Sequence, residues 1–144
     1  MTPDIIATNA PTVADREAIL QRLVDYNESR AGETKLQQFA VVLRDPENGD
    51  TIGGLTSYSF YDWLYVDVLV VPESCRGRGL GTELIRRAEN AALEQHCVGV
   101  WLNTFSFQAR GFYEKLGYDC FGEIDDHPRG AQRFFMRKRL SQRA

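Results

Sequence analysis

The strongest constraint in this sequence is one apolar run that ends at a proline. Residues 64–71 read Leu-Tyr-Val-Asp-Val-Leu-Val-Val, and Pro72 follows them. A nearly continuous apolar run of this length is typical of a strand that is buried on both faces, and a proline ends such a strand. Asp67 lies in the middle of the run, so this single acid requires an explanation.

A glycine-rich loop and a helix follow this strand. Beyond the loop, one apolar face at helical spacing predicts a helix to about His96, marked by Leu80, Leu84, Ile85, Ala88, Ala91 and Ala92. Backbone N–H groups without a helical partner, and the positive end of the helix dipole, meet in the loop Arg76–Thr82. Glycines allow positive φ and a close approach of the backbone to a ligand, and arginines hydrogen-bond to phosphate. The pattern predicts an anion site, with an ordinary tight turn as the alternative; it is neither a Walker A loop nor a dinucleotide fingerprint.

The remaining elements predict a single α/β domain over residues 1–144. Thr12 and Asp15 have the pattern of a helix N-cap, and Gly32 is expected to end that helix. The predicted strands are Asp4–Thr8, Phe39–Arg44, Thr51–Tyr61, Trp63–Val71, Val98–Asn103, Tyr118–Ile124 and Gln132–Leu140, and the predicted helices are Val13–Arg30, Leu80–His96 and Phe107–Leu116. This order predicts a mixed sheet that begins with an antiparallel meander.

Composition and charge exclude several classes of protein. The chain of 144 residues is 43% hydrophobic and 26% charged, which is too apolar for a disordered chain. It has no apolar run long enough to cross a membrane and no signal peptide, so a cytoplasmic location is expected. The net charge of −3 argues against general nucleic-acid binding. Three widely spaced cysteines and two distant histidines predict neither a disulfide framework nor a metal site.

Two segments resemble the signatures of the GNAT N-acetyltransferases. The segment Val68–Gly81 is similar to the acyl-CoA-binding motif of that family, [RQ]-x-x-G-x-[GA], whose three defined positions are filled by Arg76, Gly79 and Gly81. The segment Ala109–Tyr118 resembles a second signature, A-x-x-[FL]-Y-x-K-x-G-[FY]. Together they span roughly Leu64 to Phe121, about 40% of the chain. The resemblance implies the GNAT acyl-CoA N-acyltransferase fold, a mixed and mostly antiparallel sheet flanked by helices.

The resemblance also implies acetyl-CoA as the cosubstrate and a set of residues that hold it. These residues are Leu69, Val70, Val71, Arg76, Gly77, Arg78, Gly79, Leu80, Gly81, Thr82, Ser106, Ala109 and Tyr113. In the family a backbone N–H before the loop stabilises the oxyanion, which here implies Leu69 or Val70. Ser106 departs from the family pattern, because many members have Asn at that position. Asn103 is an alternative contact for the pantetheine arm.

Two residues are the expected catalytic groups. Tyr113 occupies the family position of the acid that protonates the leaving thiolate, and a phenol with a pKa near ~10 is protonated at neutral pH. Asp67 is the candidate base that takes a proton from the attacking amine, because an apolar strand is expected to raise its pKa. A structural carboxylate is an equal interpretation of Asp67. Four other acids are alternative bases: Asp62, Glu123, Asp125 and Asp126.

The predicted reaction is direct acetyl transfer to a primary amine of a small molecule or peptide in a ternary complex. A covalent route through Cys75 is the less favoured alternative, and a homodimer is left open. The N-terminal half is acidic, and an aromatic cluster (Tyr58, Tyr61, Trp63 and Tyr65) follows the meander, so a small cationic amine is favoured. Two rival functions are a non-catalytic acyl-CoA-binding regulatory module and a toxin-type aminoacyl-tRNA acetyltransferase. The latter draws on the basic residues Arg133, Arg137, Lys138 and Arg139.

Overall fold

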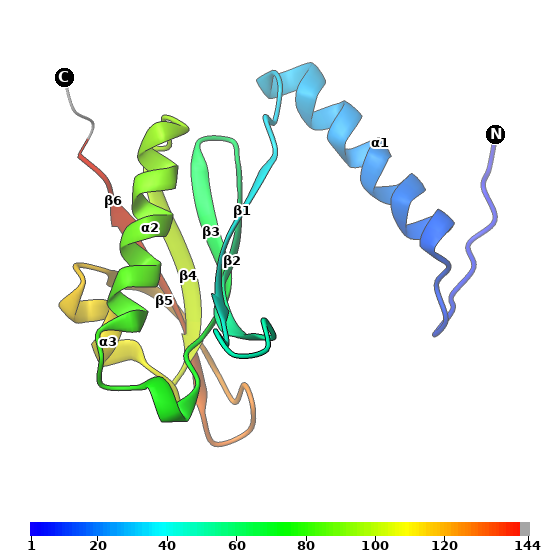
Figure 1. The fold of residues 1–144 in the computed structure, drawn as a ribbon. Coiled ribbons are helices and arrows are strands. Elements are labelled where there is room, and N and C mark those ends of the chain that lie inside the picture. Colours follow the sequence, from blue (N-terminus) through cyan, green and yellow to red (C-terminus); the bar gives the residue numbers. More distant parts are fainter. Residues whose placement is uncertain (142–144) are drawn as a thin grey trace. The chain divides into compact units, whose positions relative to one another are not determined.

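The computed structural model describes residues 1–141 of the chain. They divide into two units, Met1–Thr34 and the residues from Lys35 onward. Figure 1 labels the helices and strands of the two units.

The first unit contains the helix α1 (Val13–Ala31). The Thr12 hydroxyl accepts a hydrogen bond from the Asp15 N–H at 3.0 Å, and so satisfies one of the N–H groups that begin the helix. Gly32, at φ +81°, ends the helix, and its N–H donates to the Glu28 carbonyl at 3.1 Å. The predicted helix and both of its caps are therefore confirmed.

The strand predicted at Asp4–Thr8 is wrong, because these residues have no regular secondary structure. Ile5 and Ile6 are both exposed. A strand needs a partner that satisfies its backbone, and within the described residues this segment pairs with none. Two adjacent isoleucines are too local a signal to establish such a partner.

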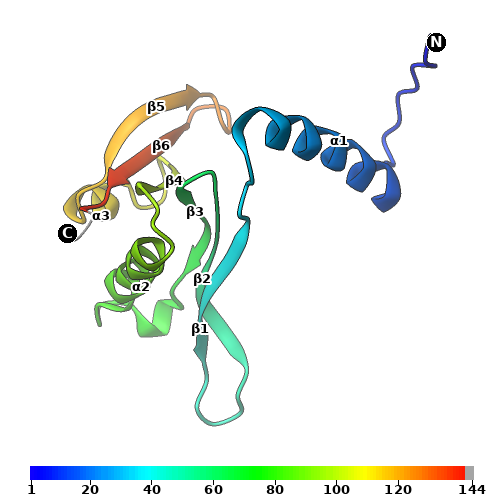
Figure 2. The same ribbon diagram turned by 90° about the horizontal axis from the view of Figure 1, so that it is seen from above.

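The second unit is built on a six-stranded sheet with the order β1-β2-β3-β4-β6-β5 (Figures 1 and 2). The strands are β1 (Gln37–Arg44), β2 (Thr51–Phe60), β3 (Trp63–Val70), β4 (Gly99–Phe105), β5 (Asp119–Asp125) and β6 (Gln132–Arg139). All neighbours are antiparallel except β3 and β4, which are parallel because a helical crossover joins them. The expected mixed, mostly antiparallel sheet is confirmed.

Helix α2 (Leu80–Glu94) is this crossover, and it packs on one face of the sheet (Figure 2). Its buried residues are Leu84, Ile85, Ala88, Ala91 and Ala92, on the face that the apolar spacing predicts. All of these except Ala91 belong to one core with Leu64, Val100, Leu102 and Met136 from the sheet. A short 3-10 helix, η1 (Glu73–Cys75), precedes α2.

Helix α3 (Arg110–Lys115) is shorter than the predicted helix Phe107–Leu116. The Gln108 side chain accepts a hydrogen bond from the Phe105 N–H at 2.7 Å. The Ala109 N–H donates to the Thr104 hydroxyl at 3.3 Å. Side-chain partners thus satisfy the backbone before the helix, and such local bonds compete with helical ones.

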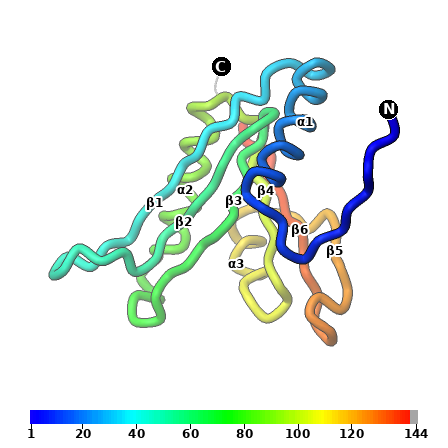
Figure 3. Tube along the Cα trace, turned by 90° about the vertical axis from the view of Figure 1, so that its right-hand side faces the viewer, coloured from blue at the N-terminus to red at the C-terminus, as the bar shows by residue number. Residues whose placement is uncertain are grey.

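Strands β3 and β4 pair over three positions only, from Trp63 opposite Gly99 to Tyr65 opposite Trp101. Beyond this point the pairing of β3 with β2 shifts by one residue, because Ser57 lies opposite Val66 and Thr56 lies opposite Val68. Such a bulge bends its strand and increases the local twist. The two parallel strands therefore run together at one end and separate at the other (Figure 3).

The expectation that this run is buried on both faces is wrong. Leu64 and Val66 are buried beneath α2, but Asp67, Val68 and Val70 are exposed. The bulge at Asp67 explains the change, since it ends the regular alternation and turns the second half of the strand away from β4.

Candidate active site

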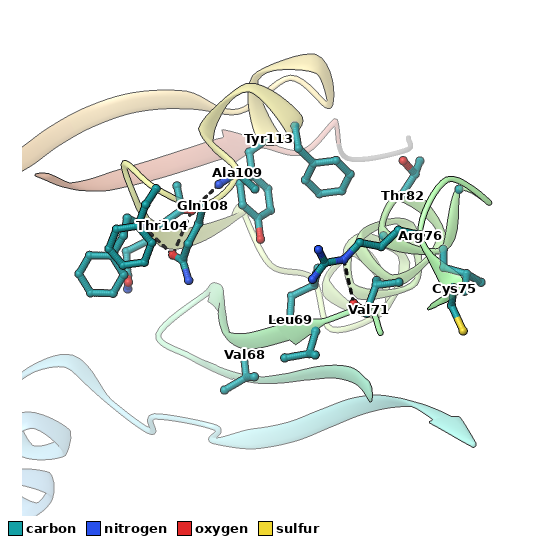
Figure 4. A pocket seen from close by; sticks show the side chains of 18 of the residues that line it. Val68, Leu69, Val71, Cys75, Arg76, Thr82, Thr104, Gln108, Ala109 and Tyr113 are labelled. Atoms are coloured by element: carbon teal, nitrogen blue, oxygen red, sulfur yellow. Dashed lines mark hydrogen bonds between the residues drawn. The ribbon is translucent and has the colours of Figure 1, made fainter. Parts of the chain in front are cut away.

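The divergence of β3 and β4 opens a cleft of about 890 Å³ (Figure 4). Most of the expected site residues line it. From β3 and its end these are Asp67, Leu69, Val70 and Val71; from the loop and the first turn of α2, Arg76, Gly77, Gly79, Leu80, Gly81 and Thr82; and from α3 and its start, Ala109 and Tyr113. Segments that are distant in sequence therefore meet around one space.

The loop before α2 presents backbone N–H groups to this cleft. Gly77 and Gly79 have φ of +80° and +75°, where a side chain would be strained. Gly79 is the N-cap and has no side chain to satisfy the first N–H groups of the helix. The first intrahelical donor is Glu83, whose N–H reaches the Gly79 carbonyl at 3.0 Å. The N–H groups at the start of α2 and the positive end of its dipole are therefore available to an anion.

Gly81 is required for a different reason. It lies within α2 and does not adopt a positive φ, unlike the two glycines before it. A Cβ atom at this position would lie 3.1 Å from Cζ of Phe112. The glycine therefore permits α3 to approach the first turn of α2, which brings the two walls of the cleft together.

Arg76 and Arg78 have different positions. The Arg76 Nε donates to the Val71 carbonyl at 3.3 Å, which closes the loop back onto the end of β3 (Figure 4). Its exposed guanidinium also lines the cleft, so its remaining N–H groups are available to a phosphate. Arg78 is exposed and does not line the cleft.

The second half of β3 provides backbone groups on the opposite wall. Val68, Leu69 and Val70 pair with β2 on one side, while β4 no longer pairs with them on the other. Backbone N–H groups on that free edge lack a strand partner. The edge contains Leu69 and Val70, the two candidates for the oxyanion contact.

Tyr113 projects from α3 into the cleft. Its hydroxyl points into the space between the walls (Figure 4), and it makes no hydrogen bond to any other residue in the part of the chain described. Only 7% of the residue is exposed, and burial raises the pKa of its phenol above the ordinary value of 10.0. The group therefore keeps its proton at neutral pH and has a free donor directed into the cleft.

Asp67 lies at the bulge and lines the cleft, but its surroundings differ from those expected. It is exposed, so the predicted apolar enclosure is wrong. The four alternative acids, Asp62, Glu123, Asp125 and Asp126, do not line the cleft. Asp67 is thus the acid that the bulge brings to this space.

Ser106 does not line the cleft. Its hydroxyl accepts a hydrogen bond from the Gln132 N–H at 3.0 Å, and its own N–H donates to the Gln132 carbonyl at 2.8 Å. These bonds connect the end of β4 to β6. Asn103, the alternative contact that the sequence offered, does line the cleft. So do two polar residues that sequence reasoning did not select, Thr104 and Gln108. The position of Gln108 next to the motif residue Ala109 was the one available signal.

Two further features bear on the chemistry. Among residues 1–141, no group of three His, Cys, Asp or Glu side chains is arranged to hold a metal ion. No helix in the same range is long and apolar enough to cross a membrane.

Comparison with known proteins agrees with this geometry. Residues 9–118 match the family model described as the acetyltransferase (GNAT) family. The match covers most of the chain, including the loop before α2 and the helix that holds Tyr113. The chain belongs to the GNAT acetyltransferase family and is an acyltransferase.

Two relatives of this chain are also named acetyltransferases. The chain is 35% identical over 131 residues to an acetyltransferase of Agrobacterium fabrum, Atu2258, covering 89% of this chain and 95% of that protein. It is 42% identical over 95 residues to blasticidin-S acetyltransferase of Streptomyces morookaense, covering 65% of this chain and 70% of that protein.

Solved structures extend the likeness to the fold. A crystal structure of an acetyltransferase from Bacillus cereus matches with a TM-score of 0.82 and 33% identity, covering 94% of this chain and 98% of that one. An aminoglycoside 6'-N-acetyltransferase, solved with coenzyme A, matches with a TM-score of 0.63 and 20% identity over 74% of this chain and 75% of that one. This second likeness concerns the fold alone.

Proposed function

We propose that this chain transfers an acetyl group from acetyl-CoA to a primary amine of a small molecule, by direct attack in a ternary complex, and that residues 1–144 form one such domain. The proposal rests on one observation: two kinds of hydrogen-bond donor, backbone N–H groups and a tyrosine hydroxyl, line the same cleft. The unpaired N–H groups at the start of α2 suit a pyrophosphate, and the Tyr113 hydroxyl suits a leaving thiolate. An aminoglycoside 6'-N-acetyltransferase of similar fold was solved with coenzyme A, which supports the choice of donor.

The residues of the cleft take distinct roles in this reaction. The loop amides and Arg76 hold the pyrophosphate, while the free edge of β3 binds the pantetheine arm. An N–H of Leu69 or Val70 donates to the oxyanion that forms when the amine attacks the thioester carbonyl. Tyr113 donates its proton to the departing sulfur, which leaves as a thiol.

The amine must lose a proton before or during its attack, because an ammonium group has no lone pair. Asp67 is the proposed base, acting directly or through one water molecule. Its exposure at the bulge suits the approach of an acceptor from solvent. A carboxylate there also attracts a cationic amine.

The acceptor is proposed to be a small cationic amine. Two observations support this class. Asp67 lines the cleft, and its charge contributes to the raised pKa of Tyr58, after the larger effect of burial and that of Tyr65. The Tyr58 and Tyr65 ring centroids are 5.4 Å apart, and such rings bind cations. One relative is a blasticidin-S acetyltransferase, so its name identifies a small molecule as the acceptor of that protein.

The test is an acceptor screen with purified protein. Release of coenzyme A is followed with a thiol reagent while acetyl-CoA is supplied with blasticidin S, an aminoglycoside, spermidine, amino acids or a lysine peptide. We expect turnover above background with at least one cationic amine, and a preference for anionic acceptors would contradict the proposed class. Calorimetry that detects no binding of coenzyme A would refute the proposal as a whole.

One variant separates direct transfer from a covalent route. Cys75 also lines the cleft, next to Arg76. If the acetyl group passes directly to the amine, Cys75→Ser retains turnover. Loss of turnover together with retained coenzyme A binding would instead place the sulfur in the reaction.

A further inference from the structure

Three polar side chains form a hydrogen-bonded chain across the sheet, one from each of β3, β4 and β6. The Asn103 Nδ2 donates to the Tyr65 hydroxyl at 2.7 Å. The Arg133 Nε donates to the Asn103 Oδ1 at 2.9 Å. Because a guanidinium has donors only, it determines which end of the Asn103 amide faces Arg133. The amide NH₂ must then face Tyr65.

This hydrogen-bonded chain determines which hydrogen-bonding group Tyr65 offers to a ligand. The Tyr65 oxygen accepts from Asn103, so its own O–H proton is directed elsewhere, and it has no acceptor among residues 35–141 of its own unit. A phenol that accepts one hydrogen bond becomes a stronger donor of the next. The ring is also held in place, since its centroid lies 4.3 Å from Trp101 and 5.4 Å from Tyr58. Tyr65 therefore offers a positioned, unused donor.

Arg133, at the other end of the hydrogen-bonded chain from Tyr65, is itself held in place. Its guanidinium lies 5.6 Å from the ring centroid of Phe105 and 5.3 Å from that of Phe135. Its Nη1 lies 3.5 Å from the His127 Nε2. Contacts on several sides leave the arginine little freedom, so it orients Asn103 rather than following it.

The hydrogen-bonded chain ends near the part of the cleft that contains Asp67, the proposed base. Asn103 and Asp67 both line the cleft, and Tyr65 precedes Asp67 by two residues on β3. Tyr65 and Asp67 also both raise the pKa of Tyr58, after the larger effect of burial, as expected if the three side chains lie close together. Tyr65 does not itself line the cleft, but it is hydrogen-bonded to Asn103 and lies near Asp67, and both of these residues do line it.

We propose that the Tyr65 hydroxyl donates a hydrogen bond to an oxygen atom of the acceptor, and that Asn103 and Arg133 are positioning residues for it. The acceptor class is then an amine that carries a hydroxyl or carbonyl oxygen near its reactive nitrogen. The donor is directed to oxygen and not to the nitrogen, because a bond to the nitrogen would occupy the lone pair that attacks the thioester. This inference rests on the proposed function and deepens it.

The test compares two acceptors in the same assay. Kanamycin carries oxygen atoms next to its amines, whereas spermidine has none. We expect Tyr65→Phe to raise the KM for kanamycin about 3- to 10-fold, the effect of one hydrogen bond, and to leave the KM for spermidine and for acetyl-CoA unchanged. The difference between the acceptors separates binding from a general effect on folding.

A double-mutant cycle tests the positioning role. Arg133→Met alone should raise the kanamycin KM, but in the Tyr65→Phe background it should raise the KM no further, because it acts through the absent hydroxyl. Arg137→Met is the matched control. Arg137 lies on the same strand with its guanidinium 5.0 Å from the Phe121 ring, but it donates nothing to Asn103. Its variant should leave the kanamycin KM unchanged.

The outcomes separate this inference from the proposed function. If the wild-type protein acetylates kanamycin and Tyr65→Phe has an unchanged KM, the inference fails while the proposed function stands. Turnover of spermidine with none of kanamycin or blasticidin S would also overturn it. If no amine is acetylated, the proposed function fails and this inference fails with it. Should Arg133→Met not fold, Tyr65→Phe, which removes a single oxygen, decides the question alone.

Discussion

The substitution Tyr113→Phe separates chemistry from folding with unusual clarity. The Tyr113 hydroxyl has no hydrogen-bond partner within residues 1–141, so its removal leaves no buried group unsatisfied. The ring and its edge-on contacts with Phe112 and Tyr118, at 5.0 Å and 6.1 Å between centroids, are kept. We therefore expect the free energy of unfolding to change by less than about 1 kcal/mol.

The rate should respond very differently. If the hydroxyl protonates the leaving thiolate, its loss lowers kcat by about 10²–10⁴, or about 3–5 kcal/mol of transition-state stabilisation. The KM for acetyl-CoA should change little, because this substitution keeps the loop backbone and Arg76, which are the proposed contacts of the pyrophosphate. Stopped-flow or steady-state thiol release gives the rate, and urea unfolding gives the stability.

Tyr118→Phe is the matched control. Tyr118 is also buried, but its hydroxyl donates to Glu89 at 2.7 Å. This variant should lose about 1–3 kcal/mol of stability and keep kcat, the opposite pattern. An unchanged kcat in Tyr113→Phe would remove Tyr113 from the mechanism. Equal losses of rate in both variants would mean that altered packing, and not the loss of a proton donor, lowers the rate.

Three other predictions concern backbone strain, pH and charge. Gly79→Ala places a Cβ at φ +75°, so this variant should lose about 1–2 kcal/mol of stability and bind coenzyme A more weakly in calorimetry. Gly49→Ala, at φ +76° in a remote turn, is the control and should lose stability only. Burial raises the pKa of Tyr118, so the folded state retains a proton that the unfolded state loses above about pH 10. Stability should therefore fall there by up to about 1.4 kcal/mol per pH unit for this tyrosine, and an equal alkaline slope in Tyr118→Phe would contradict the assignment. Lys138→Met should lose about 1–3 kcal/mol of stability in thermal unfolding, because it leaves the largely buried Glu89 carboxylate on α2 without its cation. Arg87→Met removes a cation from an exposed pair and should lose at most about 0.5 kcal/mol.

Features that depend on neighbours in sequence were predictable. The Thr12 cap, the Gly32 stop and the apolar face of α2 follow from spacing within a few residues, and all three are present. The glycine-rich loop before α2 was recognisable for the same reason, because the glycines and arginines that form it lie close together in the sequence. The order of strands after residue 36 was also recoverable, since turns and apolar alternation are local signals.

Features that depend on long-range pairing were not predictable. The segment Asp4–Thr8 forms no strand and pairs with none of the described strands, and the run expected to be buried on both faces is half exposed. Apolar composition reports what a segment could bury, but the partner that covers it lies elsewhere in the chain. The roles of Gly81 and Ser106 were hidden for the same reason, because each is explained by a contact with a distant segment, Phe112 and Gln132.

The amino-acid sequence alone therefore determined the family, the loop that suits a pyrophosphate and the position of Tyr113, because these are written in short consecutive motifs. Only the tertiary structure decided that β3 bulges at Asp67 and separates from β4, which creates the cleft. It alone also showed that the Tyr113 hydroxyl has no hydrogen-bond partner among the described residues while that of Tyr118 donates to Glu89, and that Tyr65, Asn103 and Arg133 share one hydrogen-bonded chain. The physical reason is that strand register and side-chain partnership are set between residues tens of positions apart, where no local pattern in the sequence records them.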